Sequence, residues 1–175
     1  MVAAGARVAL GGELFAMSYP VTPAVRLLRE NKISFEPRLY DYEERGGTRH
    51  SAVALGVDEH AVIKTLVMET DARCPLIVLM HGDYEVSTKN LARHLGVKTV
   101  LPCEPAIAQK HTGYLVGGTS PFGTRAKLPV YVERTIFDLP KIYINGGKRG
   151  FLVEIAPQSL REALPIEEVE VAIAE

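Results

Sequence analysis

The sequence predicts a single α+β domain in which a mixed β-sheet or barrel is wrapped by short helices. A chain of 175 residues is long enough for one domain with a substantial core. Its composition, 47% hydrophobic and 23% charged, is that of an ordinary soluble globular protein. Candidate strands and short helices are interspersed without a regular βαβ repeat, which favours a mixed sheet or barrel.

Short helices are predicted where capping residues precede or follow an apolar repeat. Thr22 and Pro23 supply an N-cap and an N1 proline for the first helix. Ser87 caps another helix, which Gly96 ends. The glycine-containing stretch 43–50 is predicted to be a loop. Further helices are predicted at Ser51–Gly56, Pro105–Thr112 and Gln158–Leu164.

Strands are predicted in short runs that are rich in β-branched and aliphatic residues. Asn145 and Gly146 fit a hairpin turn between the last two of these runs. The predicted strands are Ser34–Tyr40, Val62–Glu69, Leu76–Met80, Lys98–Leu101, Pro129–Glu133, Lys141–Ile144 and Phe151–Ile155.

Both ends of the chain are expected to lie outside the main domain, which we place at residues 17–165. Glu13 interrupts the apolar stretch in residues 1–16, so this segment is predicted to be an extension or a disordered N-terminus rather than a signal peptide. Residues 166–175 are rich in glutamate and are predicted to be an acidic tail that frays.

Several classes of protein are not expected. No apolar run approaches the ~20 residues that span a bilayer. Cys74 and Cys103 lack CxxC spacing and are too few for a secreted disulfide framework, which favours a cytoplasmic protein. The five histidines lack the spacing of metal ligands, and the glycine-rich segments match neither common nucleotide-binding motif. We therefore expect neither a metal nor another cofactor.

The net charge of −1 conceals a basic middle of the chain. Residues 60–150 contain 12 Lys and Arg against 7 Asp and Glu, an excess of five positive charges. Such an excess would steer a nucleic acid rather than bind it tightly. A solvated charged surface is the alternative.

Two glycine-dense segments, Gly113–Gly123 and Asn145–Gly150, are the main candidates for a site. Glycines allow backbone amides to approach a polar or anionic ligand closely. Ser120 is not expected to be a nucleophile, because Pro121 lacks the N–H that would complete the oxyanion hole of a nucleophile elbow. The segment could still hold a carbonyl oxygen through its amides, or it could be a plain tight turn.

Lys64 is the main charged candidate. It lies in the apolar run Ala61–Met68, so its ammonium must either reach the surface or face an anionic partner in a cavity. Lys64-Thr65-Leu66 and the two glycine segments resemble, in the same order, the motifs of the YbaK/EbsC family of aminoacyl-tRNA deacylases. The resemblance extends from about Thr22 to Leu164.

The resemblance implies the fold of YbaK and of the prolyl-tRNA synthetase editing domain, with a metal-free and cofactor-free deacylase over residues 17–165. It places Lys64 in the active site, where the amides of Gly117, Gly118 and Thr119 would hold the ester carbonyl as further catalytic groups. The predicted substrate-binding residues are Tyr40, Thr65, Ser120, Pro121, Asn145, Gly146, Gly147, Lys148, Arg149 and Leu152.

Three pocket positions differ from the family members that remove cysteine from proline tRNA. Those members have a serine at Asn145, an aspartate at Leu152 and a phenylalanine within residues 45–48. Cys-tRNA(Pro) is the first expected substrate, and tRNA mischarged with Ser, Thr, Ala or 2-aminobutyrate is the alternative. Prolyl-tRNA synthetase is a candidate second partner.

Two other functions stay open at the level of sequence. The chain could be a non-catalytic module that binds tRNA or a synthetase, or it could hydrolyse a small ester or nucleotide. An inactive relative would be expected to lose Lys64 or the first glycine segment, and this chain has both. If cysteine is the amino acid removed, its own thiol can attack the ester, so no protein nucleophile is needed.

Overall fold

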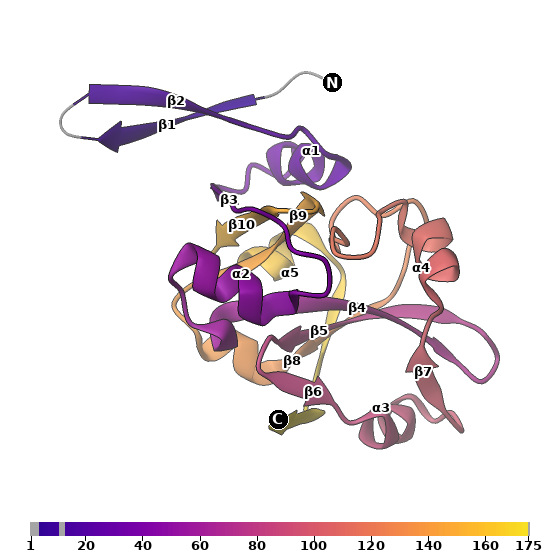
Figure 1. The fold of residues 1–175 in the computed structure, drawn as a ribbon. Coiled ribbons are helices and arrows are strands. Elements are labelled where there is room, and N and C mark those ends of the chain that lie inside the picture. The colour runs from indigo at the N-terminus through magenta and orange to yellow at the C-terminus, as the bar shows by residue number, and fades with distance from the viewer. Residues whose placement is uncertain (1–3, 11–12, 175) are drawn as a thin grey trace.

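The computed structural model describes residues 4–10 and 13–174 and confirms a mixed sheet with short helices (Figure 1). The main sheet has the strand order β11-β8-β5-β4-β9-β10-β3, and β7 pairs with part of β4. Its strands are β3 (Glu36–Leu39), β4 (Val62–Thr70), β5 (Pro75–His81), β7 (Val100–Pro102), β8 (Val130–Glu133), β9 (Ile142–Lys148), β10 (Phe151–Ile155) and β11 (Ile166–Val169).

The helices lie between these strands in the sequence. None of those described is long and apolar enough to cross a membrane. They are α1 (Pro23–Glu30), α2 (Gly47–Leu55), α3 (Thr88–Leu95), α4 (Pro105–Thr112) and α5 (Ser159–Ala163), with the short 3-10 helices η1 (Glu59–Ala61) and η2 (Arg134–Asp138).

Two of the predicted caps are confirmed. The Thr22 hydroxyl accepts a hydrogen bond from the Val25 N–H at 3.1 Å and begins α1. The Ser87 hydroxyl accepts from the Asn90 N–H at 3.2 Å, and Gly96 ends α3 in the left-handed conformation. Thr22 also donates to the carbonyl of Gly146, so the cap of α1 is joined to the second glycine segment.

Central strands β4 and β5 separate two parts of the core. Ile77 and Leu79 of β5 pack with Leu28 of α1, whereas Val78 and Met80 pack with Leu91 of α3. This alternation follows from the period of two in a strand, whose successive side chains point to opposite faces of the sheet. Strand β4 likewise contributes Ile63 to one part of the core and Met68 to the other.

The predicted loop at 43–50 is wrong in its second half, because α2 begins at Gly47. The Thr48 hydroxyl donates to the Glu59 carboxylate at 2.9 Å and lies 3.1 Å from the Gly82 carbonyl oxygen. These contacts to distant segments hold the first turn of the helix. They could not be predicted from the local glycine content.

The predicted hairpin turn at Asn145 and Gly146 is also wrong. Strand β9 continues to Lys148, and the turn into β10 follows it at residues 149–150. Lys148 pairs with Phe151 and Asn145 with Leu152, so Gly146 and Gly147 form a bulge in the ladder. Gly146 lies against the Phe151 ring, where a Cβ atom would be only 2.5 Å from the ring edge.

The acidic C-terminal segment was predicted to fray, but it forms two paired strands. Strand β11 pairs in parallel with β8, and β12 (Ala172–Ala174) pairs with β6 (Tyr84–Val86). Val169 and Val171 are almost completely buried between the glutamates. The charge of the segment suggested a solvated tail, whereas these alternating valines determine its position.

The N-terminal segment forms a separate antiparallel hairpin of β1 (Ala4–Leu10) and β2 (Glu13–Tyr19) (Figure 1). It is therefore not irregular over these residues, and residues 1–3 and 11–12 lie outside the described part of the chain. That residues 1–16 are an addition to the deacylase domain stays a prediction.

Glu133 links the C-terminal segment to the sheet, and its removal should destabilise the protein. Its buried carboxylate accepts from the N–H groups of Val171 and Ala172 at 2.8 and 3.0 Å, and also from Thr135. We expect Glu133→Ala to lower the free energy of unfolding in urea by about 3 kcal/mol. Glu170→Ala, which breaks only the exposed pair with Arg134, should cost about 1 kcal/mol or less. Equal losses of unfolding free energy in the two variants would contradict this role of Glu133.

Candidate active site

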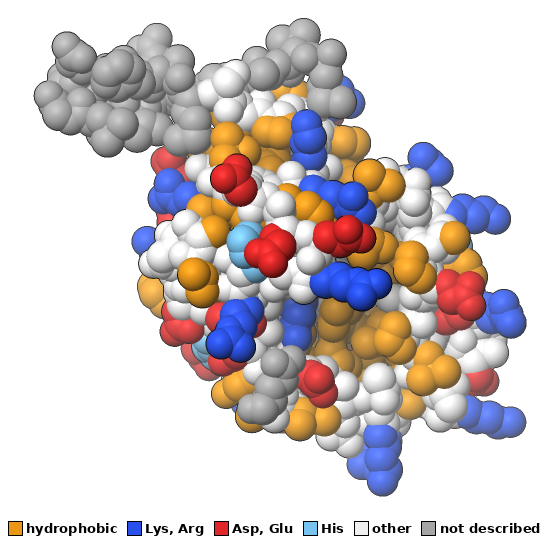
Figure 2. All heavy atoms as spheres, in the orientation of Figure 1, with side chains coloured by type: hydrophobic (Ala, Val, Ile, Leu, Met, Phe, Trp, Pro, Cys, Tyr) orange, Lys and Arg blue, Asp and Glu red, His pale blue; other side chains and the backbone are white. Residues whose placement is uncertain are grey.

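A cavity of about 400 Å³ opens between α2, β4, α4, β9 and the loop after α4. Figure 2 shows a hollow lined with hydrophobic side chains on this face of the molecule. Half of the predicted site residues line it: Tyr40, Lys64, Thr65, Gly117, Thr119, Asn145 and Leu152. The cavity therefore brings together residues from four separate parts of the sequence.

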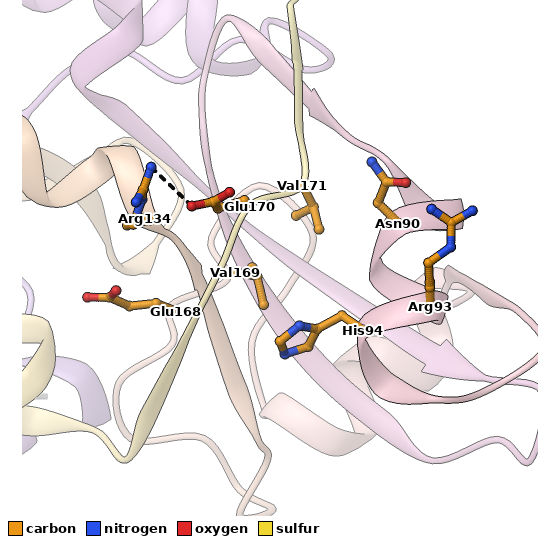
Figure 3. A pocket seen from close by; sticks show the side chains of 8 residues that line it. All are labelled: Asn90, Arg93, His94, Arg134, Glu168, Val169, Glu170 and Val171. Atoms are coloured by element: carbon orange, nitrogen blue, oxygen red, sulfur yellow. Dashed lines mark ion pairs between the residues drawn. The ribbon is translucent and has the colours of Figure 1, made fainter.

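Another hollow, of about 480 Å³, lies between α3 and the C-terminal segment (Figure 3). Most of its charged or titratable side chains pair with one another or with neighbours. Arg134 contacts Glu170 at 3.0 Å, and His94 contacts Glu167 at 2.9 Å. Because most of these side chains already have partners, this hollow is the weaker candidate for a ligand site.

Strand β4 has an open edge inside the 400 Å³ cavity. Strand β9 pairs with β4 only at Val62 and Ile63, and β7 pairs with it only from Met68 onward. Residues 64–67 therefore have a strand neighbour on the β5 side alone, within the part of the chain described. This gap in the sheet leaves main-chain groups facing the cavity.

Thr65 supplies the polar groups at this gap. The Cys103 N–H donates to the carbonyl of Val67 at 3.0 Å, so Val67 faces the open edge. Thr65 is two residues away and faces the same edge, because backbone polar groups alternate along a strand. Its hydroxyl oxygen is buried and has no hydrogen-bond partner among the described residues. Such orphaned groups are rare and costly, and a ligand or a water usually satisfies them.

The first glycine segment forms the opposite wall of the cavity through Gly117 and Thr119. The Gly118 N–H donates to the Leu115 carbonyl at 2.8 Å, so this amide is not available to a substrate. The expectation that three amides act together is wrong in this respect. No hydrogen bond among the described residues engages the N–H of Gly117 or Thr119, and these two remain candidates.

The second glycine segment supports the first and contributes little to the cavity wall. A Cβ atom on Gly118 would lie 2.9 Å from the Arg149 nitrogen, so the two backbones are in direct contact. The Asn145 side-chain amide donates to the Gly117 carbonyl at 3.0 Å, and its oxygen accepts from the Gly147 N–H at 2.7 Å. Gly146, Gly147, Lys148 and Arg149 do not line the cavity.

Ser120 and Pro121 are placed outside the cavity lining, contrary to the predicted role in substrate binding. Ser120 is completely buried, and its hydroxyl accepts from the Phe122 N–H at 3.2 Å. It therefore shapes the loop. This burial agrees with the prediction that Ser120 is not a nucleophile.

Two titratable groups in the cavity, Tyr40 and Cys103, hold their protons at neutral pH. Burial, reinforced by the neighbouring Tyr42, raises the pKa of Tyr40, so its phenol stays neutral and can donate a hydrogen bond. Burial, with a contribution from Glu69, raises the pKa of the Cys103 thiol to about 11. Among the described residues that line the cavity there is no carboxylate.

Sequence reasoning missed the contributions of α2 and of the segment before α4. Thr48, Ser51, Cys103 and Pro105 all line the cavity. The hydroxyls of Thr48 and Ser51, three residues apart, were a usable indication of one polar helix face. The prediction of a loop at 43–50 concealed it.

Comparison with known proteins identifies the family. Residues 46–163, more than half of the chain, match the model described as the aminoacyl-tRNA editing domain. The chain belongs to this family. It is 29% identical over 140 residues to a candidate Cys-tRNA(Pro)/Cys-tRNA(Cys) deacylase, EbsC, from Enterococcus faecalis, covering 79% of this chain and 85% of EbsC.

The other comparisons extend this relationship. The chain is 34% identical over 85 residues to the proline–tRNA ligase of Citrifermentans bemidjiense, which covers 49% of this chain but only 15% of the ligase. The crystal structure of a candidate trans-editing enzyme for prolyl-tRNA synthetase has a TM-score of 0.74 at 18% identity, covering 89% of this chain and all of the other. This structure confirms the predicted fold, and the family supports a deacylase acting on aminoacyl-tRNA.

The contact between the two glycine segments predicts that Gly118→Ala lowers deacylation activity much more than Ser120→Ala does. Gly118→Ala would push Cβ into the backbone of residues 148–149 and displace the cavity wall. We expect deacylation to fall on the order of 100-fold, as for a catalytic group misplaced by about 1 Å. Ser120→Ala removes only the acceptor for Phe122 and should keep most of the activity, as measured by release of amino acid from charged tRNA. A Ser120→Ala protein that is folded but inactive would contradict this assignment.

Proposed function

We propose that the protein is a trans-editing deacylase that cleaves the ester between a mischarged small amino acid and the terminal adenosine of tRNA. One observation carries the proposal: Lys64 and the open edge at Thr65 lie in the same cavity as Gly117 and Thr119. A lysine, hydrogen-bonding main-chain groups and a confined apolar space suit a small acyl group attached to a polyanion.

In this proposal the ester carbonyl lies against the amides of Gly117 and Thr119, which stabilise the negative charge that develops on its oxygen. The groups of Thr65 take the α-amino group, for which the described residues of the lining offer neutral oxygen acceptors and no carboxylate. Lys64 holds the terminal nucleotide or its phosphate. The three contacts together fix the direction of the ester in the cavity.

The attacking group comes from the substrate or from water. Ser120 is buried, Cys103 is protonated at neutral pH and Tyr40 is a neutral phenol, so the cavity lacks an activated protein nucleophile among its described residues. For a cysteinyl ester, the thiol attacks its own carbonyl carbon, the bond to the ribose oxygen breaks, and the ribose hydroxyl leaves with a proton. For other amino acids, water takes the place of the thiol.

Cys-tRNA(Pro) is the first substrate that we propose, with Ser-, Thr-, Ala- and 2-aminobutyryl-tRNA as alternatives. The name of the EbsC relative and the similarity to proline–tRNA ligases support the choice of proline tRNA. Leu152 lines the cavity and packs in a cluster with Ala52 and Val62. It makes that wall apolar, which favours acceptance of several small side chains.

Lys64 is the residue whose loss tests the proposal most directly. We expect Lys64→Ala to lower kcat/KM for deacylation at least 100-fold, because the cation that orients the substrate is gone. Lys64→Arg keeps the charge and should retain part of the activity. The thermal unfolding midpoint of each variant is the control for folding. A folded Lys64→Ala protein with full activity would remove the centre of the proposal.

Leu152 tests how the amino acid is selected. The wild type should deacylate proline tRNA charged with Cys, Ser, Thr and Ala within ~10–200-fold of one another, since apolar pockets discriminate weakly between small side chains. Leu152→Asp should shift preference toward Cys, whereas the isosteric neutral Leu152→Asn should shift it less. The readout is the ratio of kcat/KM between substrates, with urea unfolding as the control. A wild type that cleaves the Cys ester alone would refute this role of Leu152.

A further inference from the structure

Exposed apolar side chains gather at the mouth of the cavity. Leu115 and Val116 are 52% and 51% exposed, and Tyr42 is 36% exposed. Val116 also lines the cavity, and Tyr42 lies against Gly117 of the cavity wall. These three residues therefore form an apolar surface that continues from the inside of the cavity to the outside.

Arg149 is fixed beside this surface. Its guanidinium carbon lies 5.2 Å from the centre of the Tyr42 ring, and its Nε donates to the Val116 carbonyl at 2.8 Å. The planar group is thus held by a ring on one side and by a main-chain oxygen on another. Less side-chain entropy remains to be lost when a ligand stacks on it.

The surroundings of this surface carry positive charge. Lys148, Arg149 and Arg125 are all exposed, and Arg125 lies next to Gly113 at the start of the loop. None of the three forms a salt bridge with a carboxylate in the described part of the chain. A planar stack, an apolar surface and unneutralised cations together fit a flat base attached to a phosphodiester chain.

We propose that Tyr42, Arg149, Leu115 and Val116 form a stacking platform for the last base of the single-stranded 3′ end of an RNA. The inference rests on the proposed function, because an ester held in the cavity leaves its nucleoside at the mouth, where these side chains lie. Bases of single-stranded RNA stack on aromatic rings and on guanidinium planes, largely without regard to sequence.

The test is binding of an uncharged RNA hairpin with a 3′ CCA end, measured by fluorescence anisotropy with the full chain at fixed salt. A second hairpin lacks only the terminal base. Tyr42→Ala and Arg149→Lys should weaken binding of the complete RNA on the order of 5- to 150-fold, the effect of losing one stacked base. Tyr42→Phe should bind like the wild type, since the ring remains.

The hairpin without its last base separates stacking from general attraction. Wild type and Tyr42→Ala should bind it equally, because nothing remains to stack. Arg93→Met removes an exposed arginine from the hollow beside α3 and is the matched control, with little effect expected on either RNA. Thermal unfolding of each variant checks the fold.

Two outcomes would overturn the platform. One is an equal loss on both hairpins in the Tyr42→Ala variant, which would mean that the residue does not contact the base. The other is failure of the wild type to bind the complete hairpin better than the truncated one. Because uncharged RNA is used, these results do not depend on deacylation, so an inactive protein could still confirm the platform and an active one could still lack it.

Discussion

The geometry of the site depends on the direct contact between the backbones of its two glycine segments. Gly118 meets residues 148 and 149 at a distance that leaves no room for a Cβ atom, and Asn145 holds the Gly117 carbonyl from the neighbouring strand. The bulge at Gly146 and Gly147 allows this approach, and the Thr22 cap fixes it to α1. The glycines of the second segment therefore serve the packing of the first, whose Gly117 and Thr119 face the cavity.

This packing matters because the opposite wall is a strand with an unfilled edge. Strand β4 contributes side chains to both parts of the core, so packing on its two faces holds its position at the gap between β9 and β7. Main-chain groups held in this way need little reorganisation when charge develops on a substrate, which is the condition under which hydrogen bonds contribute most to catalysis. The orphaned hydroxyl of Thr65 marks the same place.

The sequence predicted the fold class and the capped helices at Thr22 and Ser87, because these have local patterns. The grouping of Lys64 with the first glycine segment followed from the family resemblance, since the residues around Lys64 alone fit a surface position as well. It did not predict that α2 begins at Gly47, since distant Glu59 and Gly82 hold that turn. Nor did it show that the Asn145–Gly146 pair bulges within a strand, because Asn-Gly fits a turn equally well. The roles expected for Ser120 and Pro121 failed because burial cannot be inferred from neighbouring glycines.

A small apolar cavity has a limited capacity to choose its substrate. One methyl or hydroxyl group changes the rate by only ~10–200-fold in such a pocket, and the wall at Leu152 offers no charge to increase that ratio. A deacylase that leaves correctly charged tRNA intact must then obtain part of its selectivity outside the cavity. The exposed surface of Leu115, Val116 and the Tyr42–Arg149 stack adjoins the cavity. Stacking of the RNA end at this surface is largely independent of sequence, so it would add affinity for the end and leave discrimination between tRNAs to contacts elsewhere.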